Sequence, residues 1–319
     1  MKRTLSLDEQ HILAALQERP GATAVELARL TKRTVATVQY TLKKFHELHG
    51  VQVRRAVNSY LLGVQNVALY FTPVFSDDEA RSKLDRILAK HPKIPWACEF
   101  IGEYQYGVTV HCRYISEVAK VVEELCDKGR MALADKQISP RICYRYFGRG
   151  YLSGARRKHP ILEHGYHHQE VDLDALDLLI LRVLSNENFR SMRDAARIVG
   201  MPSSTFDQRI RRLVKQGIIS GDIVQFSPAL VGYTTHRLML ETQMFSEEDA
   251  ARFRGLCLQL PEVVAMNETL GTFDREVIVE VAEVSGLSRL LGEFYRTFGP
   301  KIRSSRTLTE ARIISWRLF

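Results

Sequence analysis

MPSSTFDQRIRRLVKQGII, residues 201–219, has the periodicity of an amphipathic helix. At about 100° per residue, Phe206, Ile210 and Leu213 fall within about 60° of one another and form an apolar stripe. The opposite face holds short hydrogen-bonding side chains in its first turns, cations further along and no acidic residue. Because an ordinary surface helix usually mixes charges of both signs, this face favours contact with a polyanion over a merely solvated surface.

Two shorter helices are predicted before this stretch. Residues 173–186 have apolar residues at helical spacing. Residues 192–199 follow Ser191, a good N-cap, and stop at Gly200, which suits a C-cap of positive φ. Small Ala196 stands where two helices would cross, so the segment predicts a helix-turn-helix. In that motif the last helix enters the major groove of double-stranded DNA, and its later arginines reach phosphates. The predicted DNA contacts are Ser203, Ser204, Thr205, Gln208, Arg211, Arg212 and Lys215.

The chain also repeats itself. An Ile-Leu-x-x-Leu pattern at Ile12 returns at Ile180, an offset of 168 residues. The sequence GEYQ at Gly102 matches GTFD at Gly271, at an offset of 169. Because the order of such matches is kept throughout, the sequence predicts a tandem duplication with units near 1–153 and 172–319.

The first unit contains a weaker copy of the recognition helix. Val38, Leu42 and Phe45 form its inward stripe, and Lys32 stands where the second unit has Gly200. This copy is expected to retain the fold, but it is partly degenerate. Its predicted DNA contacts are Ala36, Thr37, Tyr40, Lys43 and Lys44.

After each helical triplet, the hydrophobic pattern predicts the order β-α-β-β-α-β, which is ferredoxin-like. In the second unit these elements are expected at 233–242, 246–259, 262–270, 274–283, 285–298 and 305–316. The fold class is therefore α+β, and the open faces of the two sheets can cover each other. The predicted domains are a helix-turn-helix domain (1–58), a ferredoxin-like domain (59–153), a linker (154–171), a second helix-turn-helix domain (172–228) and a second ferredoxin-like domain (229–319).

Charge is unevenly distributed along the chain. The net charge is +8, and residues 128–158 alone contain nine Lys and Arg against one acidic residue, Asp135. This basic segment is either a solvated strand edge and linker or a stripe that faces phosphates.

Other compositional features point away from membranes, metals and cofactors. No apolar run reaches the roughly 18–20 residues that span a bilayer, and the N-terminus lacks a signal-peptide pattern, so we expect a cytoplasmic protein. The five cysteines form no CxxC pair. Four histidines in the linker, His159, His164, His167 and His168, are more typical of a solvated segment than of a metal site. We therefore expect neither a metal nor a cofactor.

The second unit resembles Lrp/AsnC-type transcription regulators. The resemblance is carried by the opening LDALD, the VG turn, RIRRLVKQGII, VGY and the order PEV…GTFD. The resemblance implies binding to double-stranded DNA. Since family members pair through their sheets, it also implies that one chain forms an intrachain pseudo-dimer with two unlike recognition helices. Higher homo-oligomers of such chains are compatible with it. It also implies an amino-acid effector beside Gly271, Thr272 and Asp274, or at Gly102 in the first unit. Use of these glycines in a tight turn is an equally good explanation.

Two other functions fit the same architecture. Siroheme decarboxylases resemble Lrp regulators, and such an enzyme would use His236 with Arg237, or His111 with Arg113, on an acidic tetrapyrrole substrate. The other alternative is a helix-turn-helix module that binds only protein, which predicts no salt-dependent DNA affinity. The sequence contains no recognisable catalytic constellation, so we expect a regulator and not an enzyme.

Overall fold

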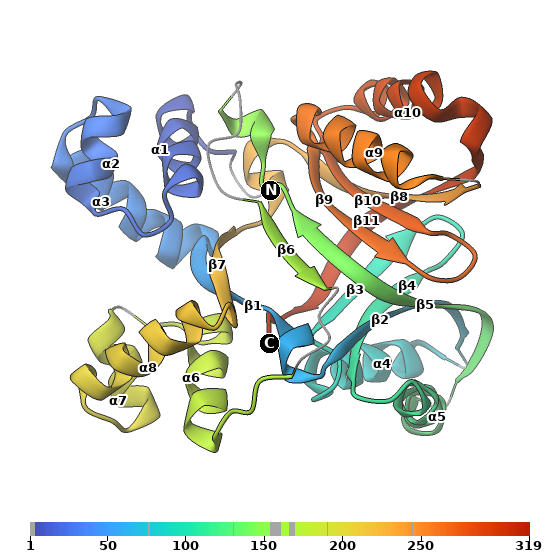
Figure 1. Ribbon diagram of the computed structural model, residues 1–319, viewed down its shortest axis with the longest axis horizontal. Coiled ribbons are helices and arrows are strands. Elements are labelled where there is room, and N and C mark those ends of the chain that lie inside the picture. Colours follow the sequence, from blue (N-terminus) through green and yellow to red (C-terminus); the bar gives the residue numbers. More distant parts are fainter. Residues whose placement is uncertain are drawn as a thin grey trace.

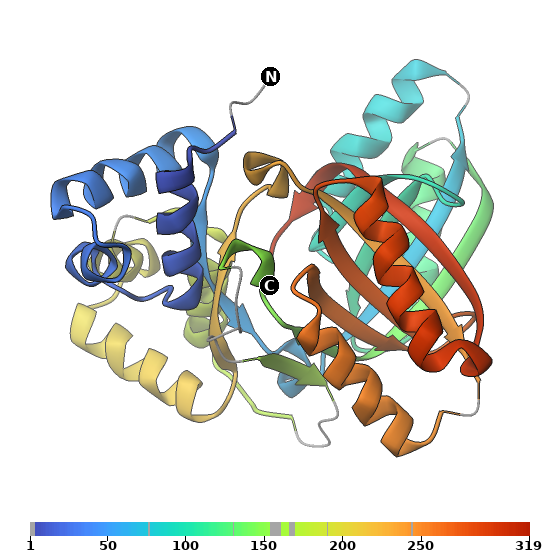
Figure 2. The same ribbon diagram turned by 90° about the horizontal axis from the view of Figure 1, so that it is seen from above.

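The computed structural model describes residues 4–75, 77–129, 131–153, 161–165, 170–189, 191–243 and 245–319. It is a mixed α+β structure, as the sequence predicts. Two groups of three helices lie at one end of the molecule, and a large antiparallel sheet flanked by helices lies at the other (Figures 1 and 2). Within the described residues, no helix combines the length and the apolar character needed to cross a membrane.

Both helical groups have the order of a helix-turn-helix. The first comprises α1 (Leu7–Glu18), α2 (Ala24–Thr31) and α3 (Val35–Lys44), and the second α6 (Ala175–Asn186), α7 (Met192–Val199) and α8 (Ser203–Lys215). Ser191 caps α7, and Gly200 ends it with a φ of 79°, as predicted. Lys32 ends α2 at a φ of 54°, a conformation that no other non-glycine residue in the described parts of the chain adopts. A π-helical turn, Phe45–His49, extends α3.

A two-stranded ribbon joins the two helical groups. Strand β1 (Gln52–Val57) follows the first group, and β7 (Ile219–Gln225) follows the second. The two strands pair antiparallel from Gln52 opposite Gln225 to Val57 opposite Ile219. The ribbon therefore fixes the position of one helix-turn-helix relative to the other.

Eight of the other strands form a closed ring. In order of hydrogen bonding the ring is β2, β4, β3, β11, β8, β10, β9 and β5, and it closes because β5 also pairs with β2. The bounds are β2 (Gln65–Val74), β3 (Trp96–Ile101), β4 (Tyr106–Cys112), β5 (Ala132–Tyr146), β8 (Thr234–Thr242), β9 (Val263–Thr269), β10 (Arg275–Val281) and β11 (Ile302–Trp316). The open faces of the two sheets turn towards each other, as expected, but the sheets also join edge to edge into one barrel.

Two strands of 15 residues each, β5 and β11, make this junction. The first part of β11 pairs with β8 and the last part with β3, and Thr309 pairs with both. Likewise, β5 pairs first with β2 and then with β9, and Arg141 pairs with both. Each long strand therefore begins in the sheet of one half of the chain and ends in the sheet of the other.

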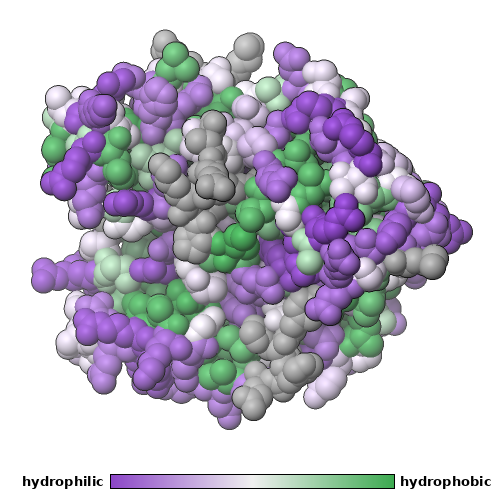
Figure 3. Space-filling model, turned by 45° about the horizontal axis from the view of Figure 1, so that its top comes forward, coloured by the Kyte–Doolittle hydropathy of each residue, from purple (hydrophilic) through white to green (hydrophobic). Residues whose placement is uncertain are grey.

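Helices cover the outside of the barrel. They are α4 (Asp78–Lys90), α5 (Ser116–Gly129), α9 (Glu247–Gln259) and α10 (Val284–Phe298). The outward side chains of β2 and β4 pack against α4 and α5, and those of β8, β9 and β10 pack against α9 and α10. In the view of Figure 3, hydrophilic side chains cover most of the rim, and hydrophobic ones gather towards the middle.

Part of the predicted linker is a strand. Residues Leu162–Gly165 form β6, which pairs with the end of β5. His164 lies in this strand, whereas His159, His167 and His168 lie outside the described residues. Among the described residues, no group of three or more His, Cys, Asp or Glu side chains is arranged to hold a metal, and all five cysteines are free thiols.

Candidate DNA-binding surface and barrel cavity

The recognition helix α8 is positioned by its apolar stripe. Phe206 and Leu213 are fully buried, and Ile210 is nearly so, in a core shared with α6 and α7. The positive φ of Gly200 turns the chain before α8, and that of Gly217 turns it afterwards. The same packing leaves the predicted contact residues on the surface: Ser203, Ser204, Thr205, Gln208, Arg211, Arg212 and Lys215 are all exposed.

The cations of α8 do not all have the same surroundings. Arg212 pairs with Asp177 of α6. Arg209, which the sequence analysis did not single out, lies 2.7 Å from Asp174 and 2.8 Å from Asp177. These two arginines therefore hold α8 against α6. Arg211 and Lys215 have no ion-pair partner in the described part of the chain, which leaves their charges available to an external anion.

The first recognition helix offers less charge. Ala36, Thr37, Tyr40 and Lys43 of α3 are exposed, and Tyr40 is 71% exposed. Lys44 is half-buried and pairs with Glu9 of α1. The inward stripe differs slightly from the prediction: Val38, Thr41 and Phe45 are buried, while Leu42 is only half-buried.

The predicted effector loop packs against the barrel itself. Gly271 has a φ of 132° and Gly102 a φ of 149°. A Cβ on Gly102 would lie 2.7 Å from a methyl group of Leu308 and 3.0 Å from the Thr307 carbonyl oxygen, so this approach, together with the φ, favours glycine. The carboxylate of Asp274 accepts the amide N–H of Thr242 at 2.8 Å, and the Thr272 hydroxyl donates to Gln137 at 2.7 Å. These internal contacts account for the loop without a ligand.

Three arginines of the basic segment have buried side chains. Arg141 and Arg145 of β5, and Arg149 just after it, each pair with a buried glutamate. For these three residues, both predictions, a solvated edge and a phosphate-facing stripe, are wrong. The physical reason is that β5 pairs with strands on both sides, first β2 and then β9, and that its C-terminal half and the turn after it turn these arginines towards buried glutamates. Arg130, Arg156, Arg157 and Lys158 lie outside the described residues.

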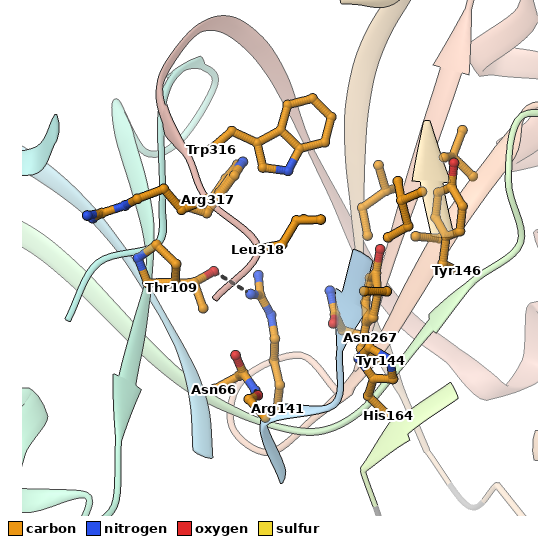
Figure 4. Close-up of a pocket in the computed structure, with 18 of the residues that line it drawn as sticks. Asn66, Thr109, Arg141, Tyr144, Tyr146, His164, Asn267, Trp316, Arg317 and Leu318 are labelled. Atoms are coloured by element: carbon orange, nitrogen blue, oxygen red, sulfur yellow. Dashed lines mark hydrogen bonds between the residues drawn. The ribbon is translucent and has the colours of Figure 1, made fainter. Parts of the chain in front are cut away.

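A partly open cavity of about 230 Å³ lies between the barrel strands, the ribbon of β1 and β7, and the C-terminal residues. Its wall combines aromatic rings with arginines, histidines and amides (Figure 4). The main contributors are Tyr60, Asn66, Trp96, Thr109, His111, Arg141, Tyr144, Tyr146, Arg149, His164, Arg237, Asn267, Glu280, Glu310, Trp316 and Arg317. In Figure 4 the Arg141 guanidinium points into the cavity and donates to the Thr109 hydroxyl, at 2.6 Å.

A buried ion cluster forms one side of this cavity. The Glu276 carboxylate is fully buried and accepts hydrogen bonds from Tyr70 at 2.6 Å, Asn267 at 3.0 Å, Arg141 at 3.0 Å and Arg237. Burial alone would raise the pKa of Glu276, but the two arginines lower it to about 2. The carboxylate therefore stays ionised.

The two residue pairs considered for tetrapyrrole chemistry are separated by the fold. Arg237 and His111 line the cavity. His236 faces away from it and hydrogen-bonds to Thr309 at 2.9 Å, and Arg113 lies at the surface 3.3 Å from Glu170. Burial, with help from Arg317 and Arg141, lowers the pKa of His111 to about 4, so its ring is neutral at pH 7.

Several cavity residues were not singled out from the sequence. In the sequence, Arg141 and Arg149 stand out only as members of the basic segment, and Arg317 lies outside it. Strand spacing does not mark them, because Arg141 belongs to β5 whereas Arg149 follows the end of that strand at Tyr146. Arg145, which lies between them in the sequence, does not line the cavity.

Comparison with known proteins supports the helical part of this site. Residues 173–220 match the family described as winged helix-turn-helix DNA-binding. The chain is 28% identical, over 38% of its length and 80% of the relative, to the HTH-type transcriptional regulator Ptr1 of Methanocaldococcus jannaschii. A crystal structure of an AsnC family transcriptional regulator from Agrobacterium tumefaciens aligns at 23% identity and a TM-score of 0.41, covering 46% of this chain and 94% of that one.

One structural similarity extends over nearly the whole chain. The crystal structure of the siroheme decarboxylase NirDL aligns with 97% of this chain and 92% of its own, with a TM-score of 0.61 and 12% identity. At that identity the similarity concerns the fold. The similarity to Ptr1, in contrast, is one of sequence and covers 38% of the chain.

Proposed function

We propose that this protein is a sequence-specific, DNA-binding transcription regulator of the Lrp/AsnC type that arose by tandem duplication. One chain then acts as a pseudo-dimer, with α3 and α8 as two unlike recognition helices. The observation that carries the proposal is the exposed face of α8, where Arg211 and Lys215 lack ion-pair partners in the described structure and Asp207 is the one exposed acidic residue of the helix.

The ribbon of β1 and β7 supports the pseudo-dimer. Because the two strands pair over six positions, the two helix-turn-helix units form one connected body within a single chain. The units also differ in charge, since Lys44 of α3 is engaged by Glu9 while Lys215 of α8 is free of such a partner in the described residues. Two unlike recognition helices held at a fixed position relative to each other suit an asymmetric DNA site.

A small effector, such as an amino acid, is part of this proposal. The loop that contains Gly271, Thr272 and Asp274, with Gly102 in the corresponding loop, remains one candidate place for it. Asp274 would have to give up its hydrogen bonds with Thr242 to bind an amino group. Release of those bonds would then be the structural event that signals binding.

Fluorescence anisotropy with labelled double-stranded DNA tests the proposal through a matched pair of variants. Arg211→Ala should weaken binding to all sequences and lower the slope of log K against log salt by about 1, since a phosphate contact is lost. Arg212→Ala should have a smaller effect, because that side chain is already paired with Asp177. Gln208→Ala and Ser204→Ala should change which sequence is preferred. Salt-independent binding, or unchanged binding in all four variants, would refute the proposal.

The fold similarity over 97% of the chain favours one second candidate, a siroheme decarboxylase-like enzyme. The cavity supplies arginines that could face an acidic substrate. At about 230 Å³, however, it is smaller than the roughly 300–1,000 Å³ typical of pockets for drug-sized ligands, and a tetrapyrrole is larger than those ligands. Incubation with siroheme decides between the candidates: tight uptake with release of carbon dioxide supports the enzyme, and unchanged free siroheme supports the regulator.

A further inference from the structure

The wall of the barrel cavity sets several charged and hydrogen-bonding side chains within a largely apolar surface. Protein interiors pack at crystal-like density, so a partly open cavity of about 230 Å³ is a space that a small molecule can enter. The polar groups converge on this single space (Figure 4). Convergent polar groups in a largely apolar concave space are the usual mark of a ligand site.

The charges of the wall specify the sign of the ligand. Four arginines line the cavity, and three of them have glutamate partners: Arg141 pairs with Glu276, Arg149 with Glu280 and Arg237 with both Glu276 and Glu310. The fourth, Arg317, donates instead to the backbone carbonyls of His91, at 2.6 Å, and Ile94, and no ion pair joins it to an acidic residue in the described chain. One positive charge is therefore unmatched by the wall, and a carboxylate would balance it.

The apolar part of the wall specifies the body of the ligand. Trp96, Trp316, Tyr144 and Tyr146 contribute flat aromatic surfaces, and Ile278 and Val264 add aliphatic ones. Trp96 is itself covered on one face by Arg237, whose guanidinium lies 4.1 Å from the ring centroid. Aromatic side chains favour stacked or edge-on contact with another flat group.

We propose that this cavity binds a small organic carboxylate with a flat apolar body, and that its occupancy changes the DNA affinity of the two helix-turn-helix units. The binding site stands on the cavity alone. The regulatory part rests on the proposed function and is measured separately.

The coupling follows from which elements close the cavity. The C-terminal residues Trp316 and Leu318 lie across it (Figure 4). The Trp316 carbonyl accepts from Gln225 of β7, at 3.2 Å, and the Leu318 amide donates to Asn186 of α6, at 2.9 Å. A ligand that displaces this C-terminal segment therefore also displaces the ribbon and the second helix-turn-helix, through these two hydrogen bonds.

The ribbon also forms part of the wall directly. Ala56 and Val57 of β1 and Ile223 of β7 line the cavity. Because the ribbon joins the two helical groups, a small shift there changes the spacing that the two helices present to DNA.

The two tryptophans of the chain provide a direct signal. Trp96 and Trp316 are the only tryptophans in the sequence, and both line the cavity. Indole fluorescence of the full-length protein is therefore measured during titration with phenylacetate, phenylacetamide and acetate. Phenylacetate should give a saturable change with a Kd below about 1 mM, and the neutral amide and acetate should each bind at least about 10-fold more weakly.

Three variants locate the signal. Ala265→Leu adds volume inside the cavity and should abolish the response, whereas Ala134→Leu adds the same volume at an exposed position of β5 and should not. Arg317→Met should remove the preference for acid over amide, with folding checked by circular dichroism. A response absent up to about 10 mM, equal for acid and amide, or unaltered by Ala265→Leu would overturn the site.

The regulatory part is tested by DNA anisotropy with saturating phenylacetate. We expect at least an about 3-fold change in the Kd for DNA in the unmodified protein and none in Ala265→Leu. Ligand binding without this change would overturn the coupling while the site stands. If the protein binds no DNA with or without ligand, the proposed function is refuted. The fluorescence titration would still show whether the cavity binds the carboxylate.

Discussion

Replacement of Glu276 by glutamine should destabilise the barrel strongly. Gln has almost the same volume, so no cavity is created and the effect reports on charge. The buried carboxylate accepts from Tyr70, Asn267, Arg141 and Arg237, and an amide nitrogen in place of one oxygen would face these donors with hydrogens of its own. Arg141 would also lose its buried counter-ion.

Two independent routes give the magnitude. Removal of one partner from a buried ion pair typically costs about 3–5 kcal/mol. Separately, holding the pKa of Glu276 at about 2 in place of an ordinary 4.5 corresponds to about 3 kcal/mol in favour of the folded, ionised state. Since the folded pKa is depressed, this contribution is present above pH 4.5 and is lost as the pH falls towards 2.

Urea unfolding followed by tryptophan fluorescence measures the loss, because Trp96 belongs to β3 and Trp316 to β11 of the barrel. The control is Glu241→Gln, which removes the same charge from a partly exposed pair with Arg303 and should cost less than about 0.5 kcal/mol. A loss below about 1 kcal/mol for Glu276→Gln at neutral pH, or equal losses for both variants, would contradict the account of the ion cluster.

Three further predictions concern backbone and protonation. Lys32→Gly should stabilise the turn after α2 by about 1 kcal/mol, because this position has a left-handed φ. Gly200 has a left-handed φ too, so Gly200→Lys should destabilise the turn after α7 by a similar free energy. Hydrogen exchange of the neighbouring amides measures both effects. Because the pKa of His111 is about 4 when folded against 6.5 ordinarily, stability should fall by up to about 3 kcal/mol as pH drops from 6.5 to 4, and His111→Gln should remove that slope in urea titrations. Gly165→Ala should separate β6 from β5, because the added Cβ would lie 2.8 Å from the Cys143 Cα. Faster hydrogen exchange of the β6 amides would show this loss of pairing.

The sequence predicted the local elements well where side-chain pattern and caps agree. The stripe of Phe206, Ile210 and Leu213 defines α8, and Ser191 and Gly200 bound α7, because each of these residues acts on its own turn of helix. In the second half, the strands and helices lie within three residues of their expected bounds, since alternation and helical spacing are properties of a single segment.

The closure of the barrel could not be predicted in the same way. It depends on β5 and β11 each changing partner halfway, at Arg141 and Thr309, and no local pattern marks such a change. For the same reason, the arginines of β5 look like a surface stripe until the strands on both sides are known. The cavity, built from β2, β4, β5, β8 and the C-terminal segment, is a product of this closure.

Selection of bound DNA from a random pool by the full-length protein shows whether one chain reads DNA through two unlike helices. We expect an enriched asymmetric motif, in which one half depends on α8 and tolerates changes in α3, because the two recognition helices differ in sequence and in free charge. Repeating the selection with Gln208→Ala should alter only that half. Recovery of no motif would contradict sequence-specific DNA binding, and a perfect palindrome would contradict two unlike recognition helices acting within one chain.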